Sequence, residues 1–340
     1  MPHRIATLAS GDEIRAYAFT APPAEDGAVV EPAARYPAVE TAREHAAAPD
    51  LSRAAYHTRE ELVCVDRGGA VLWQRSLEVE SADGPLLTGS GTCAFSADGT
   101  TLWVYRRGPL VPMRRGLSAE TDRLLDRNPH MRQGTDRLLA LGAADGAVLA
   151  EADLKSSGHG AELRPHPDGK HVLVGVAEGQ DGGRTFRARL NGDTLGLHEY
   201  DALFSFLRDL SPNGRVFSLS DEEGSVEFRS FPDGELIREL DVGAFGYDEE
   251  EFETLFVGTY LADFVDDGTA VVSVHGERVV REGDGELSED FHENHLVRVG
   301  DGRVLGRLPL TSRTGTGLAP LGDGTWLDHT APGEVRRYRR

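Results

Sequence analysis

The stretch Ser211-Pro212-Asn213-Gly214-Arg215-Val216-Phe217-Ser218-Leu219-Ser220 opens the most regular part of the chain, which continues to Leu240. Short runs of alternating apolar and polar residues follow one another there. Each run ends at a turn that contains glycine: Asn213-Gly214, Glu223-Gly224 and Asp233-Gly234. Alternation between glycine-containing turns is typical of antiparallel strands. With a further strand expected at 203–210, the segment predicts four strands in about 40 residues, which is the size of one propeller blade.

The turn of Asp or Asn followed by Gly recurs along the chain. Its copies are Asp98-Gly99, Asp168-Gly169, Asn213-Gly214, Asp267-Gly268 and Asp323-Gly324, with a weaker first copy at Asp50-Leu51. An Asp or Asn side chain can bond the backbone within such a turn, and glycine adopts positive φ without a Cβ clash. The copies are 48, 70, 45, 54 and 56 residues apart. A repeat of about 40–50 residues, lengthened in places by insertions, predicts a propeller.

We therefore expect an all-β fold in which residues 1–340 form a single β-propeller domain. The repeats predict about six four-stranded blades, or seven if residues 1–45 build a blade of their own. The last unit, from 314 to 339, shows only three strands. Strand-like runs at 4–9 and 13–19 suggest that a strand from the N-terminus completes it, which would close the ring and remove an exposed edge.

Two motifs resemble those of known propellers. The turn at Phe95–Gly99 resembles the turn between the first and second strands of WD repeats, and Asp66, Gly69 and Trp73 resemble the Asp, Gly and Trp pattern of quinoprotein-like blades. Over residues 45–340 the chain is thus similar to the WD-repeat and quinoprotein-like β-propeller superfamily. This resemblance implies the fold and not an activity, because propellers host many unrelated functions.

The net charge of −21 is unevenly distributed. Residues 241–293 contain sixteen Asp or Glu and two Arg, whereas residues 106–137 contain eight Arg and four acidic residues. An acidic field repels the phosphates of nucleic acids and anionic membranes, so we expect neither as a partner. The chain has no apolar run of membrane-spanning length, and its first residues lack the apolar core of a signal peptide, so we expect a cytoplasmic protein. Its preference for Arg over Lys is typical of high-GC bacterial genomes.

Four segments depart from the blade pattern and are expected to be insertions: 20–45, 107–134, 241–256 and 276–291. Segment 107–134 is rich in arginine, and it contains a short helix predicted at 118–127. Its residues Arg107, Arg114 and Arg115 could dock an acidic partner, pair with the acidic insertions of the same chain, or stay solvated.

Segment 241–256 places Tyr247 and Phe252 among acidic residues. Aromatic rings among acids suit a protein-binding loop, but they could equally fix the loop to the blade beneath. The last three insertions connect strands at the same end of their blades, so we expect them to share one face of the ring.

His292 and His295 are the weak candidates for metal ligands. On a helix they would share a face, but on a strand an offset of three places them on opposite faces, so we expect no metal site. The acidic stretches do not match a calcium loop. The chain also lacks a nucleophile elbow, a phosphate-binding loop, and the tryptophans and calcium site that quinone chemistry would need, so we expect no cofactor.

The sequence therefore favours a non-enzymatic interaction scaffold that binds a protein partner through loops on one face. The alternative is an enzyme of the lyase or hydrolase type with a polar site at the mouth of the propeller channel. Charged side chains clustered inside the channel would favour the enzyme. An exposed aromatic or charged patch would favour the scaffold.

Overall fold

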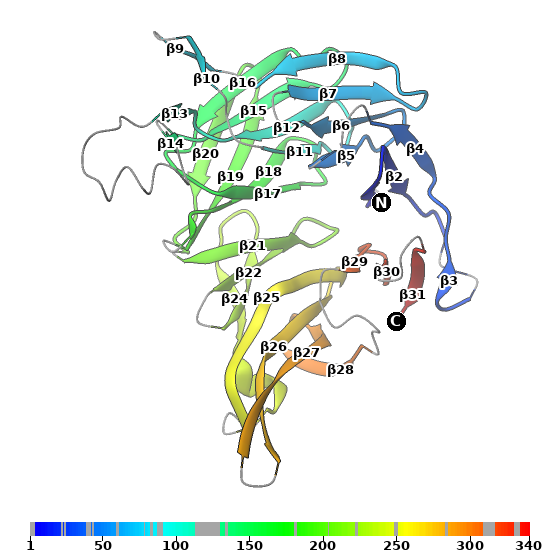
Figure 1. The fold of residues 1–340 in the computed structure, drawn as a ribbon, viewed down its shortest axis with the longest axis vertical. Coiled ribbons are helices and arrows are strands. Elements are labelled where there is room, and N and C mark those ends of the chain that lie inside the picture. Colours follow the sequence, from blue (N-terminus) through cyan, green and yellow to red (C-terminus); the bar gives the residue numbers. More distant parts are fainter. Residues whose placement is uncertain are drawn as a thin grey trace.

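Seven antiparallel sheets, each made of short strands between tight turns, form a ring (Figure 1). In this computed structural model the chain is an all-β, seven-bladed β-propeller. The structure describes residues 4–340 apart from 22, 24, 39–41, 43, 59–60, 78, 82–83, 87–90, 113–129, 133–134, 180–181, 203, 222–223, 248–250, 283–284, 309–316 and 330–333.

The first four blades follow the chain. Blade 1 contains β1 (Ala6–Ser10), β2 (Glu13–Tyr17) and β4 (Ala34–Pro37). Blade 2 contains β5 (His45–Ala47), β6 (Arg53–His57), β7 (Glu61–Asp66) and β8 (Val71–Ser76). Blade 3 contains β11 (Thr92–Phe95), β12 (Thr101–Arg106), β15 (Arg137–Gly142) and β16 (Val148–Asp153). Blade 4 contains β17 (Gly160–Pro165), β18 (His171–Ala177), β19 (Gly183–Asn191) and β20 (Thr194–Glu199).

The other three blades complete the ring. Blade 5 contains β21 (Ser205–Leu210), β22 (Val216–Asp221), β23 (Val226–Ser230) and β24 (Leu236–Leu240). Blade 6 contains β25 (Phe252–Asp266), β26 (Thr269–Glu282), β27 (Gly285–Arg298) and β28 (Arg303–Arg307). Blade 7 contains β29 (Leu318–Pro320), β30 (Thr325–Asp328), β31 (Arg336–Arg339) and β3 (Ala28–Val29).

Smaller elements lie between the blades. Two short hairpins are formed by β9 (Val79–Ser81) with β10 (Gly84–Leu86), and by β13 (Leu110–Pro112) with β14 (His130–Arg132). The 3-10 helix η2 (Val242–Phe245) precedes β25. Within the described ranges, none of the helices combines the length and the apolar character that a membrane crossing requires.

The turns between first and second strands have the geometry that the sequence predicts. Gly99 and Gly214 lie at φ values of +71° and +74°, where a side chain would strain the backbone. In blade 5 the Asn213 Oδ1 accepts hydrogen bonds from the Ser211 hydroxyl at 3.0 Å and from the backbone N–H of Arg215 at 2.9 Å. Local side-chain chemistry therefore fixes these turns, and with them the start of each second strand.

The apolar core lies between neighbouring blades. Trp73 on β8 shows how one blade docks on the next: its indole Nε1 donates to the Ala143 carbonyl in blade 3 at 3.1 Å. A Cβ on Gly146 would come within 2.7 Å of the Trp73 ring, so the glycine allows this close approach. Trp73, the tryptophan of the quinoprotein-like pattern, thus forms a contact between blades 2 and 3.

The ring contains seven blades, the alternative to the expected six. Strand-like runs 4–9 and 13–19 do not close the ring as expected, because as β1 and β2 they build blade 1. These strands have their own apolar face, on which Ile14 and Tyr36 are fully buried against blade 2. Segment 20–45, expected to be an insertion, contains the third strand of this blade, β4.

A strand from the N-terminal part does close the ring, as the sequence predicts, but it is β3. Ala28 pairs with Arg337 and Val29 with Arg336, so β3 is the fourth strand of blade 7 (Figure 1). The chain leaves blade 1 after β2, adds this strand to the last blade, and returns to form β4. The two ends of the chain are therefore interlocked.

Arg337 reinforces the closure from inside blade 7. Its side chain is buried, donates to Asp323 Oδ2 and the Ala21 carbonyl at 2.7 Å and to Thr325 Oγ1 at 3.0 Å, and lies 4.1 Å from the centre of the Phe19 ring. One guanidinium thus connects β31 to the segment that leads into β3.

Substituting Arg337→Ala should therefore lower the free energy of unfolding by about 3 kcal/mol, since three hydrogen bonds and the packing on Phe19 are lost together. Urea unfolding followed by circular dichroism measures this change. Arg339→Ala, at an exposed position on the same strand, should change it little. Equal effects of the two substitutions would contradict the role given to Arg337.

Candidate functional site

The first three strands of blade 6 are more than twice as long as the strands of blade 5. β25 has 15 residues and β26 and β27 have 14 each, and they continue beyond the blade as a three-stranded extension (Figure 1). We call residues 252–260, 275–282 and 285–293 the arm. At about 3.3 Å per residue, the eight residues 275–282 extend about 26 Å. The segment expected as an insertion at 276–291 is therefore the outer end of two paired strands.

One face of the arm, the closed face, is covered by the loop that precedes β25. The Tyr247 ring contacts Phe252 and Phe291 edge to face at 5.6 and 5.3 Å. Its hydroxyl donates to Glu293 Oε2 at 2.5 Å and accepts from His295 Nε2 at 2.7 Å. Burial, reinforced by the Glu293 carboxylate, raises the pKa of Tyr247, so the phenol stays protonated.

The Arg278 guanidinium completes the closed face, 5.1 Å from the centre of the Phe252 ring and 5.0 Å from that of Phe291. Tyr247 and Phe252, the two aromatic candidates for partner binding, therefore lie in contacts within this chain. The sequence leaves open whether these rings bind a partner or fix the loop to the blade. This packing corresponds to the second alternative.

The other face of the arm, the open face, carries four rings. Phe256 and Tyr260 lie 5.3 and 4.2 Å from His275, measured between ring centres, and His292 lies 6.0 Å from Tyr260. Tyr260 is 54% exposed. Burial lowers the pKa of His275, where the neighbouring His292 adds to the effect, and burial likewise lowers the pKa of His292. Both imidazoles are therefore neutral at neutral pH.

Two acidic residues lie next to these rings. Glu277 and Asp290 are directly opposite each other on β26 and β27, and both are exposed. Neither makes an ion pair with any described residue. Like charges directly opposite each other on a sheet are destabilising. Among the described side chains, therefore, no ion pair neutralises either carboxylate on the open face.

His292 and His295 lie on opposite faces of β27, as expected for an offset of three on a strand. His295 contacts Phe245 and Tyr247 on the closed face, whereas His292 lies beside His275 on the open face. The two weak metal candidates therefore cannot share one ion.

The arginine candidates are only partly within the described residues. Arg107 follows β12 and is half-buried, and its Nε makes no hydrogen bond to the parts of the chain that are described. Arg114 and Arg115, and the helix predicted at 118–127, lie outside the described residues. Segment 107–134 joins the second and third strands of blade 3, and blades 4 and 5 separate it from the arm (Figure 1).

A cluster of charged side chains lies where the inner strands of the blades meet. Arg4 reaches from blade 1 to Asp209 in blade 5, with its Nη1 donating to Asp209 Oδ2 at 2.7 Å, and it also bonds the Leu210 carbonyl. Arg164 lies 3.5 Å from the other Asp209 oxygen and donates to Glu162 at 2.8 Å. These mutual pairs connect blades 1, 4 and 5 and stabilise the channel side of the ring.

Asp263 is the exception in this cluster. Its carboxylate accepts no hydrogen bond and makes no ion pair among the described residues. Burial, together with the nearby Asp209 carboxylate, raises the pKa of Asp263 to about 7. The Arg164 and Arg4 charges offset this effect only in part, and a carboxylate of raised pKa at the inner strands is the feature that the enzyme alternative requires.

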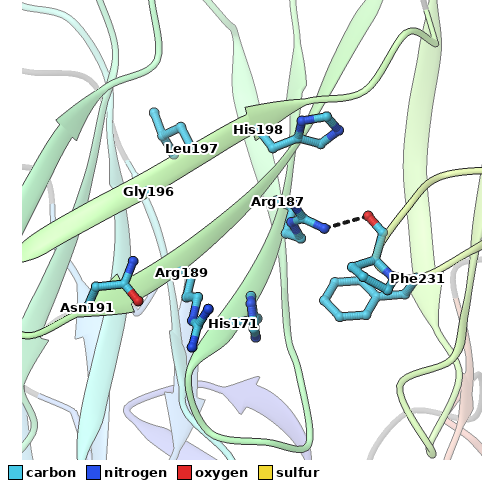
Figure 2. A pocket seen from close by; sticks show the side chains of 9 residues that line it. His171, Arg187, Arg189, Asn191, Gly196, Leu197, His198 and Phe231 are labelled. Carbon is cyan, nitrogen blue, oxygen red and sulfur yellow. Dashed lines mark hydrogen bonds between the residues drawn. The ribbon is translucent and has the colours of Figure 1, made fainter.

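A pocket of about 420 Å³ lies between blade 4 and the turn that follows β23 in blade 5 (Figure 2). Arg187 is held at its edge, because its Nη1 donates to the Pro232 carbonyl at 2.6 Å and its guanidinium lies 6.0 Å from the centre of the Phe231 ring. Arg189 makes no hydrogen bond or ion pair with the described residues. Other polar side chains on the wall are His171, Asn191 and His198.

His171 also belongs to a group with His166 and Asp168 whose ligand atoms lie within 4.8 Å of one another. These atoms already satisfy each other. His171 Nδ1 donates to Asp168 Oδ2 at 2.6 Å, and His166 Nδ1 accepts the backbone N–H of Asp168 at 3.1 Å. His166 occupies the turn position that Ser211 has in blade 5. The group is therefore a blade turn and not a metal centre.

Sequence reasoning missed both the open face and the pocket. The sequence does not indicate that Tyr260 is exposed on this face. It lies in an irregular part of β25, where the register with β26 shifts between Val257 and Ala262, so strand alternation does not predict its side. A signal for the pocket exists, since Arg187 and Arg189 alternate on one strand and so share a face. Nothing in the local sequence indicates that Phe231 of the next blade lies opposite them.

Comparison with known proteins identifies no relative: no family model matches the chain, and a search of the curated proteins finds no significant match. The structure establishes a seven-bladed β-propeller. Membership of the WD-repeat or quinoprotein-like families stays a prediction from the turns and Trp73. Because propellers host many unrelated functions, the fold alone does not indicate what this protein does.

Substituting Asp263→Asn tests the channel carboxylate. Between an ordinary Asp pKa of about 3.9 and about 7, the folded chain keeps a proton that the unfolded chain releases, so wild-type stability falls as pH rises. The variant lacks this contribution, and its stability relative to wild type should rise from about pH 4 to about pH 7. Urea midpoints across this range measure it.

Asp233→Asn, in an exposed turn, is the control and should follow the wild-type profile. Parallel profiles for wild type and Asp263→Asn would contradict the raised pKa.

Proposed function

We propose that the protein is a non-enzymatic interaction scaffold that binds a basic segment of a protein partner on the open face of the arm. The observation that carries this proposal is the pair Glu277 and Asp290, which lie opposite each other beside four aromatic rings and make no ion pair with the described residues. A Lys or Arg of the partner would supply the missing charge.

The support of the arm suits a binding surface. On its closed face the ring of Tyr247 lies on Phe252 and Phe291, and its hydroxyl bonds Glu293 and His295, so the arm is fixed from one side. Side chains that are held before a partner arrives lose less conformational entropy on binding. The open face is therefore presented on a rigid extension of the blade.

The chemistry of the open face is that of cation recognition. A guanidinium or ammonium is attracted to the face of an aromatic ring, and Tyr260 is the most exposed ring of the four. His275 and His292 are neutral because burial lowers the pKa of each, so they do not repel a basic partner. Such a small surface fits a transient complex better than an obligate one.

The enzyme alternative has one observation in its favour, the unpaired Asp263. The remaining charges that we find in the channel cluster bond one another: Arg4 bonds Asp209, and Arg164 bonds Glu162. Such mutual pairing stabilises a ring and leaves few groups for a substrate. On the open face of the arm, by contrast, Glu277 and Asp290 are exposed and make no ion pair with the described residues, and we therefore prefer the scaffold.

Binding of a protein partner should depend on Tyr260 and Glu277. Immobilised Tyr260→Ala and Glu277→Lys variants should retain at least roughly tenfold less of a lysate protein that the wild type retains at low salt, because each loses part of the cation site. Quantitative mass spectrometry of the eluates measures this, and the retained segment should be rich in Lys or Arg.

Matched controls are Leu236→Ala and Glu239→Lys, which make the same kinds of change at exposed positions of β24. They should retain the partner as the wild type does. Because Glu277→Lys removes a like-charge contact, it should not destabilise the arm, so a loss of binding is not a loss of folding. The scaffold proposal fails if the arm variants and the wild type retain the same proteins in the same amounts.

A further inference from the structure

We propose that the pocket between blades 4 and 5 binds a small organic ligand through a phosphate group. The pocket is separate from the arm, and the residues that support this proposal are not those that support the partner proposal. The wall is formed by β18, β19 and β20 on one side and by Phe231 and Pro232 on the other (Figure 2).

Strand register collects the polar side chains of the pocket on one face of blade 4. His171 pairs with Arg189, and Arg189 pairs with Gly196, so the three residues form one row across the sheet. Arg187, two residues before Arg189, pairs with His198 in the next row on the same face. The sheet thus directs two guanidiniums and two imidazoles into one space.

Gly196 leaves this space open. Its φ is not positive, and an added Cβ would only approach Asn191 Nδ2 at 3.4 Å, so the backbone does not require glycine there. The missing side chain exposes the row that contains Arg189. A larger residue at this position would fill the pocket without changing its charge.

The charges in the pocket suit an anion. None of the residues that line it is acidic, although the protein carries a net charge of −21. The nearest carboxylate, Asp168, holds His171 Nδ1 at 2.6 Å and leaves Nε2 as the ring nitrogen available to the pocket. Although its burial opposes the effect, hydrogen bonds from Lys170 and His171 lower the pKa of Asp168, so it stays ionised.

Arg189 is the group that a ligand would engage first. Arg187 already donates to Pro232, whereas Arg189 makes no bond with the described residues and can present two N–H groups to an oxyanion. A phosphate monoester offers three acceptor oxygens and close to two negative charges at neutral pH. It can therefore accept from Arg187 and Arg189 together, and its two charges match the two guanidiniums better than the single charge of a carboxylate does.

The volume and the apolar lining of the pocket suit a ligand that is larger than a phosphate group. The volume of about 420 Å³ falls in the range of small-molecule pockets and exceeds the needs of a bare phosphate. Phe231 and Pro232 supply apolar wall for an organic group. A long polyanion such as a nucleic acid is disfavoured because the acidic surface would repel it.

The test is calorimetric titration with three probes: inorganic phosphate, phenyl phosphate and phenol. We expect phenyl phosphate to bind more tightly than inorganic phosphate, and phenol not to bind. Arg189→Gln should weaken phenyl phosphate roughly tenfold or more, because it removes a charge-assisted contact. Gly196→Leu should weaken it by filling the space. Arg303→Gln, at an exposed position of blade 6, is the charge-matched control and should bind as the wild type does.

Three results would overturn the proposal: equal affinity of wild type and Arg189→Gln, binding of phenol as tight as that of phenyl phosphate, or no binding of either phosphate up to about 10 mM. Because Arg189 is exposed and unbonded, Arg189→Gln should melt at the wild-type temperature, and thermal unfolding confirms that a loss of affinity is local.

Discussion

The pairing of β3 with β31, in which Ala28 lies opposite Arg337 and Val29 opposite Arg336, joins residues about three hundred positions apart, and the rest of the ring depends on it. Without β3, blade 7 would end on the open edge of β31, and an open edge invites pairing with other chains. The same closure brings Arg4 to Asp209 across the channel. Each blade then packs on two neighbours, as Trp73 does against Gly146, so the ring behaves as one unit.

The closed ring separates two sites by topology. The arm extends from the connection between the second and third strands of blade 6, whereas the pocket between blades 4 and 5 lies at turns between first and second and between third and fourth strands. In antiparallel blades these connections emerge at opposite ends. An acidic, aromatic surface at one end and a basic pocket at the other would let one rigid body hold a partner while it senses a small ligand.

Local chemistry decided what the sequence could predict. The Asp-Gly and Asn-Gly turns are set by residues a few positions apart, so they indicated blade positions and the fold. The two residues of β3 have no alternating pattern, and their partner strand is at the far end of the chain, so the sequence predicts closure by an N-terminal strand without indicating that β3 is that strand. Likewise, Tyr247 is held by long-range contacts with Phe291 and Glu293, whereas Tyr260 lies exposed in a part of β25 where the register shifts, and neither outcome can be read from the local sequence.

Hydrogen–deuterium exchange followed by mass spectrometry tests the closed ring most directly. Exchange of amides that open only when the whole domain unfolds reports global stability. The amides of β31, and those of Gly27 and Val30 that donate to the Arg337 and Val335 carbonyls, should be protected as strongly as those of the central strands of blade 4. Rapid exchange of both strands, at the rate of frayed chain ends, would show that β3 does not close the ring and would contradict the account.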